Sequence, residues 1–307
     1  MNKVIVIAGP TASGKTGLSI EVAKQLNTEI VSADSMQIYR GMDVGTAKIT
    51  PEEMSGVVHH MIDIVSVEEN YNVSQYVTDA KSCVDAILQQ GKIPVIAGGT
   101  GLYINSLVYG YDLAPIPSDD SIREELTRLY EEKGGEYLRR ELQKIDPKTA
   151  QRLHPNNARR LIRALEVYRI SGTTISEQEE RTKNAPRPYD VHFFVLDTDR
   201  EVLYDRINRR VDIMLENGLL EEVKHLLEQG VPRHNTAMQA IGYKEMVEYL
   251  DGYLSFSEAV EKIKQESRRY AKRQLTWFRR NEGAIWLEAT LTKEELAKEI
   301  LKTIEKG

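Results

Sequence analysis

The stretch Gly9–Thr16, GPTASGKT, constrains the fold of this chain more than any other feature of its sequence. It fits G-x-x-x-x-G-K-[ST] and lies between a short apolar run, Lys3–Gly9, and a segment with helical spacing of apolar residues, Gly14–Leu26. When a buried strand enters a helix through such a turn, successive backbone N–H groups converge on phosphate oxygens. We therefore expect a phosphate-binding loop made of Gly9, Pro10, Thr11, Ala12, Ser13, Gly14, Lys15 and Thr16.

Two side chains of this loop have separate chemical tasks. Lys15 neutralises the outer phosphates, and the Thr16 hydroxyl is a ligand for Mg²⁺. The partial positive charge at the start of the following helix adds to the attraction for an anion. The loop predicts a phosphate ligand but does not specify a reaction.

Strand and helix patterns alternate around the loop. Short apolar runs at 29–34, 60–65 and 92–99 predict further strands, and a long amphipathic helix is expected at 73–90, ending at Gly91. This alternation is typical of an α/β fold with a parallel sheet, here a P-loop NTPase-like core.

A different pattern interrupts this core. Two proline-rich connections, 111–120 and 184–190, enclose helical segments with no strand between them. We therefore predict a core of residues 1–114 and 188–307 and an all-helical insertion at 115–187. The remaining elements expected from periodicity are two helices in the insertion, a returning strand and four C-terminal helices, at 121–144, 156–170, 190–199, 200–216, 219–229, 257–280 and 293–305.

Charge is unevenly distributed along the chain. The net charge of −6 by itself argues against a nucleic-acid partner. However, residues 1–120 hold 7 basic and 14 acidic side chains, whereas 152–187 hold 8 and 4, and 262–280 hold 8 and 1. Each basic segment alone could be a solvated helix face, but two of them in an acidic chain favour a partner rich in phosphate.

Cysteine content and hydropathy exclude other classes. The single cysteine, Cys83, rules out an internal disulfide and a multi-cysteine zinc site. No apolar run reaches about 18 residues and the start lacks a signal-peptide pattern, so we expect a cytoplasmic protein without a membrane span. His59 and His60 lack a second pair of ligands, and a structural role is favoured over metal binding.

Carboxylates follow two of the expected strands. Asp34 lies at the carboxyl end of its strand, where open α/β sheets bind ligands, and could hold Mg²⁺, orient a nucleophile or accept its proton. An aspartate that caps a turn or helix is the alternative. Asp63 has a similar position and could be a metal partner like that of a Walker B motif, although a structural role is favoured.

Taken in order along the chain, these motifs resemble those of the tRNA dimethylallyltransferases. The resemblance spans nearly the whole chain, and the single cysteine is in keeping with the bacterial form, which lacks the zinc finger of eukaryotic relatives. Besides the phosphate-binding loop it rests on DSMQIYRGMDVGTAK (34–48), HHMID (59–63), GGTGLY (98–103), NNARRLIRALEV (156–167), RINRRVDIMLENGLLEEV (206–223), AIGYKE (240–245) and KRQLTWFR (272–279).

The resemblance implies a prenyl transfer. The dimethylallyl group of dimethylallyl diphosphate moves to the exocyclic amine of the adenine 3′-adjacent to the anticodon of tRNA, and diphosphate is released. The loop then holds the diphosphate of the donor rather than ATP hydrolysed for energy, with Mg²⁺ as cofactor. The implied partners are the anticodon stem-loop of tRNA and dimethylallyl diphosphate, and we expect a monomer.

The resemblance also implies roles for individual residues. Thr11, Lys15 and Thr16 contact the diphosphate, Arg210 reaches it with support from Arg206, and Asp34 accepts the proton of the amine. Trp277 and Phe278 are expected in the core rather than against RNA. The residues implied to contact tRNA are Asp34, Ser35, Met36, Gln37, Thr100, Arg123, Arg159, Arg160, Leu161, Ile162, Arg163, Gln239, Lys244 and Arg273.

Two other enzyme classes share parts of this pattern. A small-molecule P-loop kinase would have a short arginine-bearing lid in place of a long helical insertion and two basic segments. An adenylate-type prenyltransferase, which uses a free nucleotide, would have little need for the basic segment 262–280. A GTPase is excluded because no NKxD guanine signature is present.

Overall fold

A computed structural model describes residues 2–110 and 119–306 of the chain. The chain divides into two compact units, one comprising Met1–Val108 with Tyr189–Gly307 and the other Tyr109–Pro188, which we call the core unit and the helical unit. The sequence placed the insertion at 115–187. Of the expected proline-rich connection 111–120, residues 111–118 lie outside the described residues.

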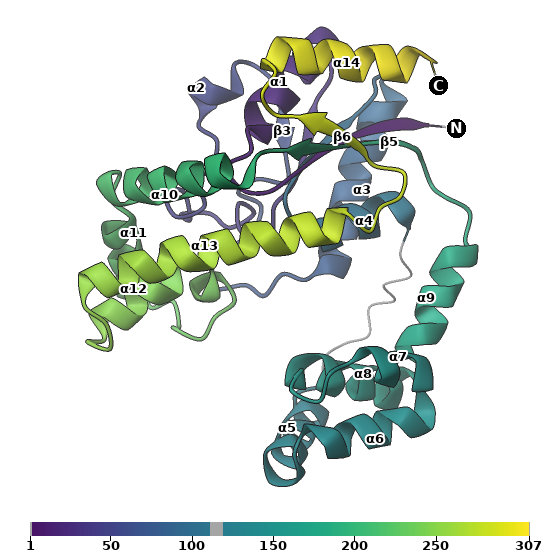
Figure 1. The fold of residues 1–307 in the computed structure, drawn as a ribbon, viewed down its shortest axis with the longest axis vertical. Helices are drawn as coiled ribbons and strands as arrows, with labels where there is room; N and C mark the ends of the chain where they lie inside the picture. Colours follow the sequence, from purple (N-terminus) through teal and green to yellow (C-terminus); the bar gives the residue numbers. More distant parts are fainter. Residues whose placement is uncertain (1, 111–118, 307) are drawn as a thin grey trace. The chain divides into compact units, whose positions relative to one another are not determined.

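The core unit is built on a six-stranded sheet in the order β3-β2-β4-β1-β5-β6, in which every pairing is parallel (Figure 1). The expected α/β fold with a parallel sheet is therefore confirmed. The strands are β1 Lys3–Ala8, β2 Ile30–Ala33, β3 His59–His60, β4 Val95–Gly98, β5 Asp190–Asp197 and β6 Ile285–Glu288.

Helices cover both faces of this sheet because successive apolar residues of its strands point to opposite faces, so that both faces are apolar. Ile5 and Ile7 of β1 pack in one core cluster with residues of α1 and α14, whereas Phe193 of β5 faces Phe278 of α13, with 6.2 Å between the ring centroids. The core unit holds α1 Lys15–Gln25, α2 Pro51–Met54, α3 Val73–Gln89, α4 Gly101–Tyr109, α10 Arg200–Glu216, α11 Leu219–Glu228, η1 Ala237–Gln239, α12 Tyr243–Leu250, α13 Phe256–Phe278 and α14 Lys293–Lys306.

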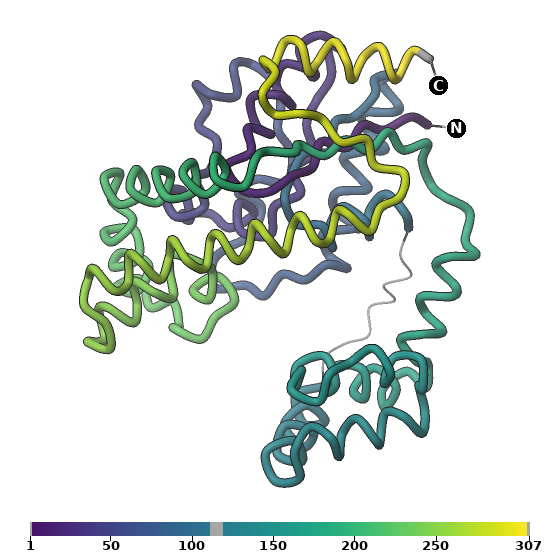
Figure 2. The backbone as a smooth tube through the Cα atoms, in the orientation of Figure 1, coloured from purple at the N-terminus to yellow at the C-terminus, as the bar shows by residue number. Residues whose placement is uncertain are grey.

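The two ends of the chain meet in the core unit (Figure 2). The Lys3 ammonium group, at the start of β1, donates to the backbone oxygen of Ile304 in α14 at 3.0 Å. This hydrogen bond therefore joins the C-terminal helix to the start of the first strand.

Two strand predictions needed correction. The expected strand 60–65 is limited to His59–His60, because Met61 and Asp63 have φ values of 64° and 55° that end the extended backbone. The edge strand β6 was not expected, since four residues are too few for a clear period of alternation. The expected helix 73–90 is confirmed, with Asn72 as its N-terminal cap.

The helical unit contains five helices in its described part, around an apolar core that includes Leu126, Leu138 and Leu161. The single helix expected at 121–144 is broken at Gly134, whose φ of 77° begins a new helix. These helices are α5 Asp120–Lys133, α6 Gly135–Ile145, α7 Pro147–Arg152, α8 Ala158–Ser171 and α9 Ile175–Asn184.

Candidate active site

A cavity of about 520 Å³ opens at the carboxyl ends of β1, β2 and β4. Its walls come from the phosphate-binding loop, from Asp34–Gln37, from Gly98 and Gly99, and from side chains of α10 and α13. All of its lining residues belong to the core unit. This is the edge of a parallel sheet at which the chain leaves each strand and at which ligands of open α/β folds bind.

The phosphate-binding loop has the strained backbone that its motif requires. Gly14 caps the start of α1 with a φ of 94°, and Ala12 has a φ of 61°. Thr11, Lys15 and Thr16 line the cavity, whereas Gly9, Pro10, Ala12, Ser13 and Gly14 shape the loop without lining it. The start of α1 therefore points its free N–H groups and its partial positive charge toward the cavity.

Lys15 is held close to this loop. Its ammonium group donates to the backbone oxygen of Pro10 at 2.6 Å. Burial and, to a smaller extent, the positive charge of Arg210 lower the pKa of Lys15 to about 7, although Asp34 acts in the opposite direction. An anion bound here would hold this amine in its charged form.

Arg210 reaches the same cavity from α10. Its Nη2 donates to the backbone oxygen of Thr46 at 3.2 Å, while its Nε is buried and has no hydrogen-bond partner among the described residues. Burial lowers the pKa of Arg210, and Asp34 offsets part of this effect. Arg206, one turn earlier, is exposed and does not line the cavity, so the structure does not bring it to the site beside Arg210.

Asp34 lies half-buried at the end of β2. Its Oδ1 accepts the backbone N–H groups of Met36 at 2.9 Å and of Gln37 at 3.3 Å. Its Oδ2 makes no hydrogen bond within residues 2–110 and 119–306. The two interpretations of this aspartate are therefore compatible, since one oxygen shapes the turn and the other is left for a ligand.

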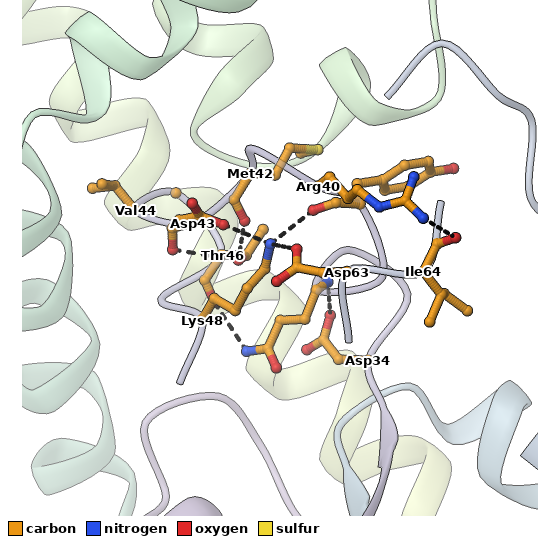
Figure 3. A network of polar contacts seen from close by, with 12 residues as sticks. Asp34, Arg40, Met42, Asp43, Val44, Thr46, Lys48, Asp63 and Ile64 are labelled. Atoms are coloured by element: carbon orange, nitrogen blue, oxygen red, sulfur yellow. Dashed lines mark hydrogen bonds and ion pairs between the residues drawn. The ribbon is translucent and has the colours of Figure 1, made fainter. Parts of the chain in front are cut away.

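The loop that follows Asp34 is braced by Lys48 (Figure 3). The Lys48 ammonium group donates to Asp63 at 2.5 Å, to Asp43 at 2.6 Å and to the backbone oxygen of Tyr39 at 2.7 Å. Asp63 is engaged by this ion pair and does not line the cavity. The structure therefore supports the structural role of Asp63 over a metal-binding one.

Glu222 of α11 holds the other side of this loop, a role that was not predicted from the sequence. Its carboxylate accepts the backbone N–H groups of Asp43, Val44 and Gly45 at 2.8–3.0 Å, together with the hydroxyl of Tyr243 at 2.5 Å. A Cβ atom at Gly45 would lie 2.4 Å from the Tyr243 ring, so only glycine fits. These contacts hold the backbone that carries Thr46, the acceptor of Arg210.

Most residues expected to contact tRNA in the core unit line the cavity. They include the Gln37 side chain, whose Nε2 donates to the backbone oxygens of Thr46 and Ala47 at 3.3 and 3.4 Å. Thr100 does not line the cavity, and its hydroxyl accepts the backbone N–H of Ser35 at 3.1 Å. Those that line it are Asp34, Ser35, Met36, Gln37, Gln239, Lys244 and Arg273.

The arginines that were expected to contact tRNA in the helical unit form two pairs. Arg159 and Arg160 are exposed on α8 and form no ion pair in the part of the chain that the structure describes. Arg123 and Arg163 flank the fully buried carboxylate of Glu166, at 3.0 and 2.8 Å. Their guanidinium groups thus also neutralise a charge inside the unit.

Leu161 and Ile162 require a correction. Their exposed fractions are 0% and 9%, and both pack in the apolar core of the helical unit. Leu161, two positions after Arg159, turns to the opposite side of α8, and Ile162 beside it packs in the same apolar core. Their side chains therefore stabilise the unit and are not available to RNA.

Two polar residues of α13 at the cavity were not predicted from the sequence. Burial raises the pKa of Tyr270 to about 12, while the polar side chains of Thr100 and Gln274 act in the opposite direction. Gln274 is 5% exposed. Gln274 lies three residues after Ala271 and four residues before Phe278, so it is a polar residue on the apolar face of the helix. This break in the apolar pattern is the signal by which the sequence could have indicated it. Phe278 is buried as expected, and Trp277 packs against Gly101.

Neither a cluster of metal ligands nor a membrane-spanning helix occurs in the described part of the chain. Within residues 2–110 and 119–306, no group of three or more His, Cys, Asp or Glu side chains could hold a metal ion. His60 pairs with Glu29 at 2.7 Å, and Nδ1 of His59 is 2.9 Å from the backbone oxygen of Val57, in line with structural roles. No described helix is long and apolar enough to cross a membrane.

Comparison with known proteins gave a consistent result. The model of one family, described as IPP transferase, matches residues 37–281. A tRNA dimethylallyltransferase of Bacillus mycoides is 50% identical over 303 residues, which cover 99% of this chain and 94% of the relative. One of Acetivibrio thermocellus is 52% identical over 291 residues, covering 94% and 92%.

Solved structures agree with these relatives. The tRNA isopentenylpyrophosphate transferase from Bacillus halodurans is 45% identical and has a TM-score of 0.75, covering all of this chain and 96% of that one. A eukaryotic dimethylallyltransferase acting on tRNA is 33% identical with a TM-score of 0.79, covering 94% of this chain and 74% of that one.

Proposed function

The chain belongs to the IPP transferase family, and we propose that it transfers the dimethylallyl group of dimethylallyl diphosphate to the exocyclic amine of the adenine 3′-adjacent to the anticodon in tRNA. It is a prenyltransferase that acts on tRNA, as its relatives are. The assignment of roles to its residues rests on one observation. Lys15, Arg210 and Asp34 come from three separate elements and line the same cavity.

The cationic side of the cavity suits a diphosphate leaving group. The allylic carbon can share developing positive charge with its double bond only if the departing diphosphate is stabilised. Lys15 supplies positive charge, and the start of α1 supplies N–H donors. Arg210 reaches the cavity from α10, and its Nε has no hydrogen-bond partner among the described residues. Thr11 and Thr16 add hydroxyl groups at the same wall.

Asp34 is suited to the amine. The adenine amine is a weak nucleophile because its lone pair is delocalised into the ring, so it must be aligned behind the allylic carbon and lose a proton. Oδ1 of Asp34 is fixed by two backbone N–H groups, and Oδ2 is free of partners in the described chain. We assign Oδ2 as the acceptor of that proton.

The remaining lining residues suit an extruded nucleotide. The base must leave the anticodon stack to enter a cavity, at a cost of a few kcal/mol that contacts with the protein offset. Ser35, Met36 and Gln37 follow Asp34 directly, and Gln239 and Lys244 lie on the cavity wall. Arg273, whose guanidinium stands 5.6 Å from the Tyr270 ring, is placed for phosphate or for stacking.

The residues present fit a Mg²⁺ ion that is held mainly by its substrate. The cavity wall offers the Thr16 hydroxyl, and no cluster of three metal ligands occurs among the described residues. Mg²⁺ commonly keeps several waters and binds substrate phosphates with few protein ligands. When bound, the ion would neutralise charge on the diphosphate, and Thr16 is the residue that would hold it.

We further propose that one copy of the chain acts on each tRNA, because Lys15, Asp34 and Arg210 already meet in one cavity without a second copy. Light scattering of the chain with one tRNA species would report a 1:1 complex. A 2:2 complex would contradict this stoichiometry.

The decisive experiment offers the enzyme labelled dimethylallyl diphosphate with either bulk tRNA or AMP. We expect label in tRNA alone, at an adenine next to the anticodon when the product is digested and sequenced. Label in AMP but not in tRNA would instead establish an adenylate-type prenyltransferase.

A further inference from the structure

Gln274 is a polar side chain on the buried face of α13. It is 5% exposed and shares this face with Ile263, Ala271 and Phe278, all of which are apolar and buried. A buried amide is costly unless both its oxygen and its nitrogen are hydrogen-bonded. Its partners therefore indicate why a glutamine stands at this position.

Both ends of the amide bind backbone groups at the cavity. Oε1 accepts the N–H of Thr11 at 2.9 Å, and Nε2 donates to the backbone oxygen of Gly99 at 2.9 Å. Because a peptide N–H only donates and a carbonyl only accepts, these partners fix the orientation of the amide. Thr11 follows β1 and Gly99 follows β4, which are neighbours in the sheet.

Close packing leaves this bridge little freedom. A Cβ atom at Gly99 would lie 2.2 Å from Nε2 of Gln274, so the backbone approaches the amide as only glycine allows. The next residue, Thr100, accepts the N–H of Ser35, which follows Asp34. Through Gln274 and Thr100, α13 thus connects the chain segments after β1, β4 and β2.

We propose that Gln274 is a positioning residue, which holds the phosphate-binding loop against the end of β4 and so sets Thr11 and its bound diphosphate opposite Asp34. The inference rests on the proposed function, because it requires a diphosphate bound at Thr11 and an adenine amine bound at Asp34. Gln274 does not need to touch either substrate for this role. It acts through the backbone of Thr11 and Gly99.

The first test replaces the amide with an apolar side chain of similar length. Gln274→Met leaves the N–H of Thr11 and the oxygen of Gly99 without partners, and small misplacements of reacting groups can cost up to about 100-fold in rate. We expect kcat/KM for dimethylallyl diphosphate to fall about 10- to 100-fold. Affinity for inorganic diphosphate should fall as well, while the Kd for tRNA stays within about twofold.

A matched control separates positioning from general stability. Phe278→Leu removes buried volume one turn later on α13, where the side chain packs against Phe193 of β5. It should lower Tm with kcat/KM unchanged below the transition. If Gln274→Met and Phe278→Leu had equal effects on kcat/KM at equal loss of Tm, the positioning role would be overturned.

The second test uses pH to restore the bridge. In Gln274→Glu, a protonated carboxyl can accept from Thr11 and donate to Gly99, whereas the ionised form has no proton to donate. The kcat/KM of this variant relative to the native chain should rise as pH falls from about 8 to about 6, and the ratio for Gln274→Met should stay flat. A flat ratio for Gln274→Glu would contradict the inference, and this variant carries the test alone if Gln274→Met does not fold.

Inorganic diphosphate distinguishes this inference from the proposed function. If the native chain transfers no prenyl group to tRNA, yet Gln274→Met still weakens diphosphate binding, the proposed function fails and the positioning role remains. If the native chain is active and Gln274→Met matches it in both measurements, the positioning role fails and the function remains.

Discussion

The cavity in the core unit and the surface of α8 in the helical unit both carry arginine and lysine, but in opposite environments. Lys15 and Arg210 are half-buried in the wall of the cavity, and burial lowers the pKa of each. Arg159 and Arg160 are exposed and solvated. Buried cations interact strongly with a ligand that fits between them, whereas exposed cations attract any polyanion in a manner that salt weakens. We therefore expect the cavity to carry out the chemistry and the exposed arginines of α8 to attract tRNA.

The strongest test of this division is Asp34→Ala. Loss of the proton acceptor should lower kcat by about 10²- to 10⁴-fold, because general-base catalysis contributes that much to such reactions. The Kd for tRNA, measured by filter binding, should change little, since the helical unit is untouched. Retained turnover would show that the base lies elsewhere.

Arg210→Ala addresses the cationic side of the cavity. We expect kcat to fall about 10²- to 10³-fold, as for the loss of one donor that stabilises a developing anion. Arg206→Ala is the control, because Arg206 lies one turn away on α10 and is exposed. Equal losses in the two variants, measured by single-turnover transfer of label, would argue against a specific role for Arg210.

Reversing the exposed charges tests the other region. Arg159→Glu with Arg160→Glu should weaken tRNA binding and reduce the slope of log K against log salt by about 2, with kcat at saturating tRNA nearly unchanged. Arg140→Glu on α6 is the control, since its side chain is exposed and lies 3.9 Å from Glu136. An unchanged salt slope would remove α8 from the interface with tRNA.

The smallest expected effect is a proton count. With a folded-state pKa of about 7, below its ordinary 10.5, Lys15 is mostly neutral near pH 8 in the free chain. A bound diphosphate favours the charged amine, so binding should take up nearly one proton, as calorimetry in buffers of different ionisation enthalpy would report. Lys15→Met should abolish this part of the uptake, and equal uptake in both chains would refute it.

The same depressed pKa predicts the direction of a stability change. Between about pH 7 and pH 10.5 the unfolded chain binds more protons at Lys15 than the folded chain, so stability rises with pH in this window. Removing the amine should therefore raise Tm more at about pH 6 than at about pH 9. A shift of equal size at both pH values would mean that Lys15 is not desolvated.

Much of the core could be predicted from sequence, and its failures have local causes. The loop Gly9–Thr16 and the strands around it were recognisable because motif and periodicity act over a few neighbouring residues. Strand β3 is shorter than expected because Met61 and Asp63 adopt left-handed backbone conformations, which no simple sequence pattern reveals. Leu161 and Ile162 were expected at the RNA surface because they stand beside arginines, although both side chains pack in the apolar core of the helical unit.

By itself the sequence determined the phosphate-binding loop, the alternation of strands and helices, and the segregation of basic charge. These follow from backbone conformation and from periods of a few residues, which adjacent side chains encode. Only the tertiary structure decided that Lys15, Asp34 and Arg210 share one cavity and that Gln274 binds Thr11, 263 residues away in sequence, and Gly99. Such contacts depend on how distant segments pack, and the lowered pKa values of Lys15 and Arg210 arise only from the burial that this packing creates.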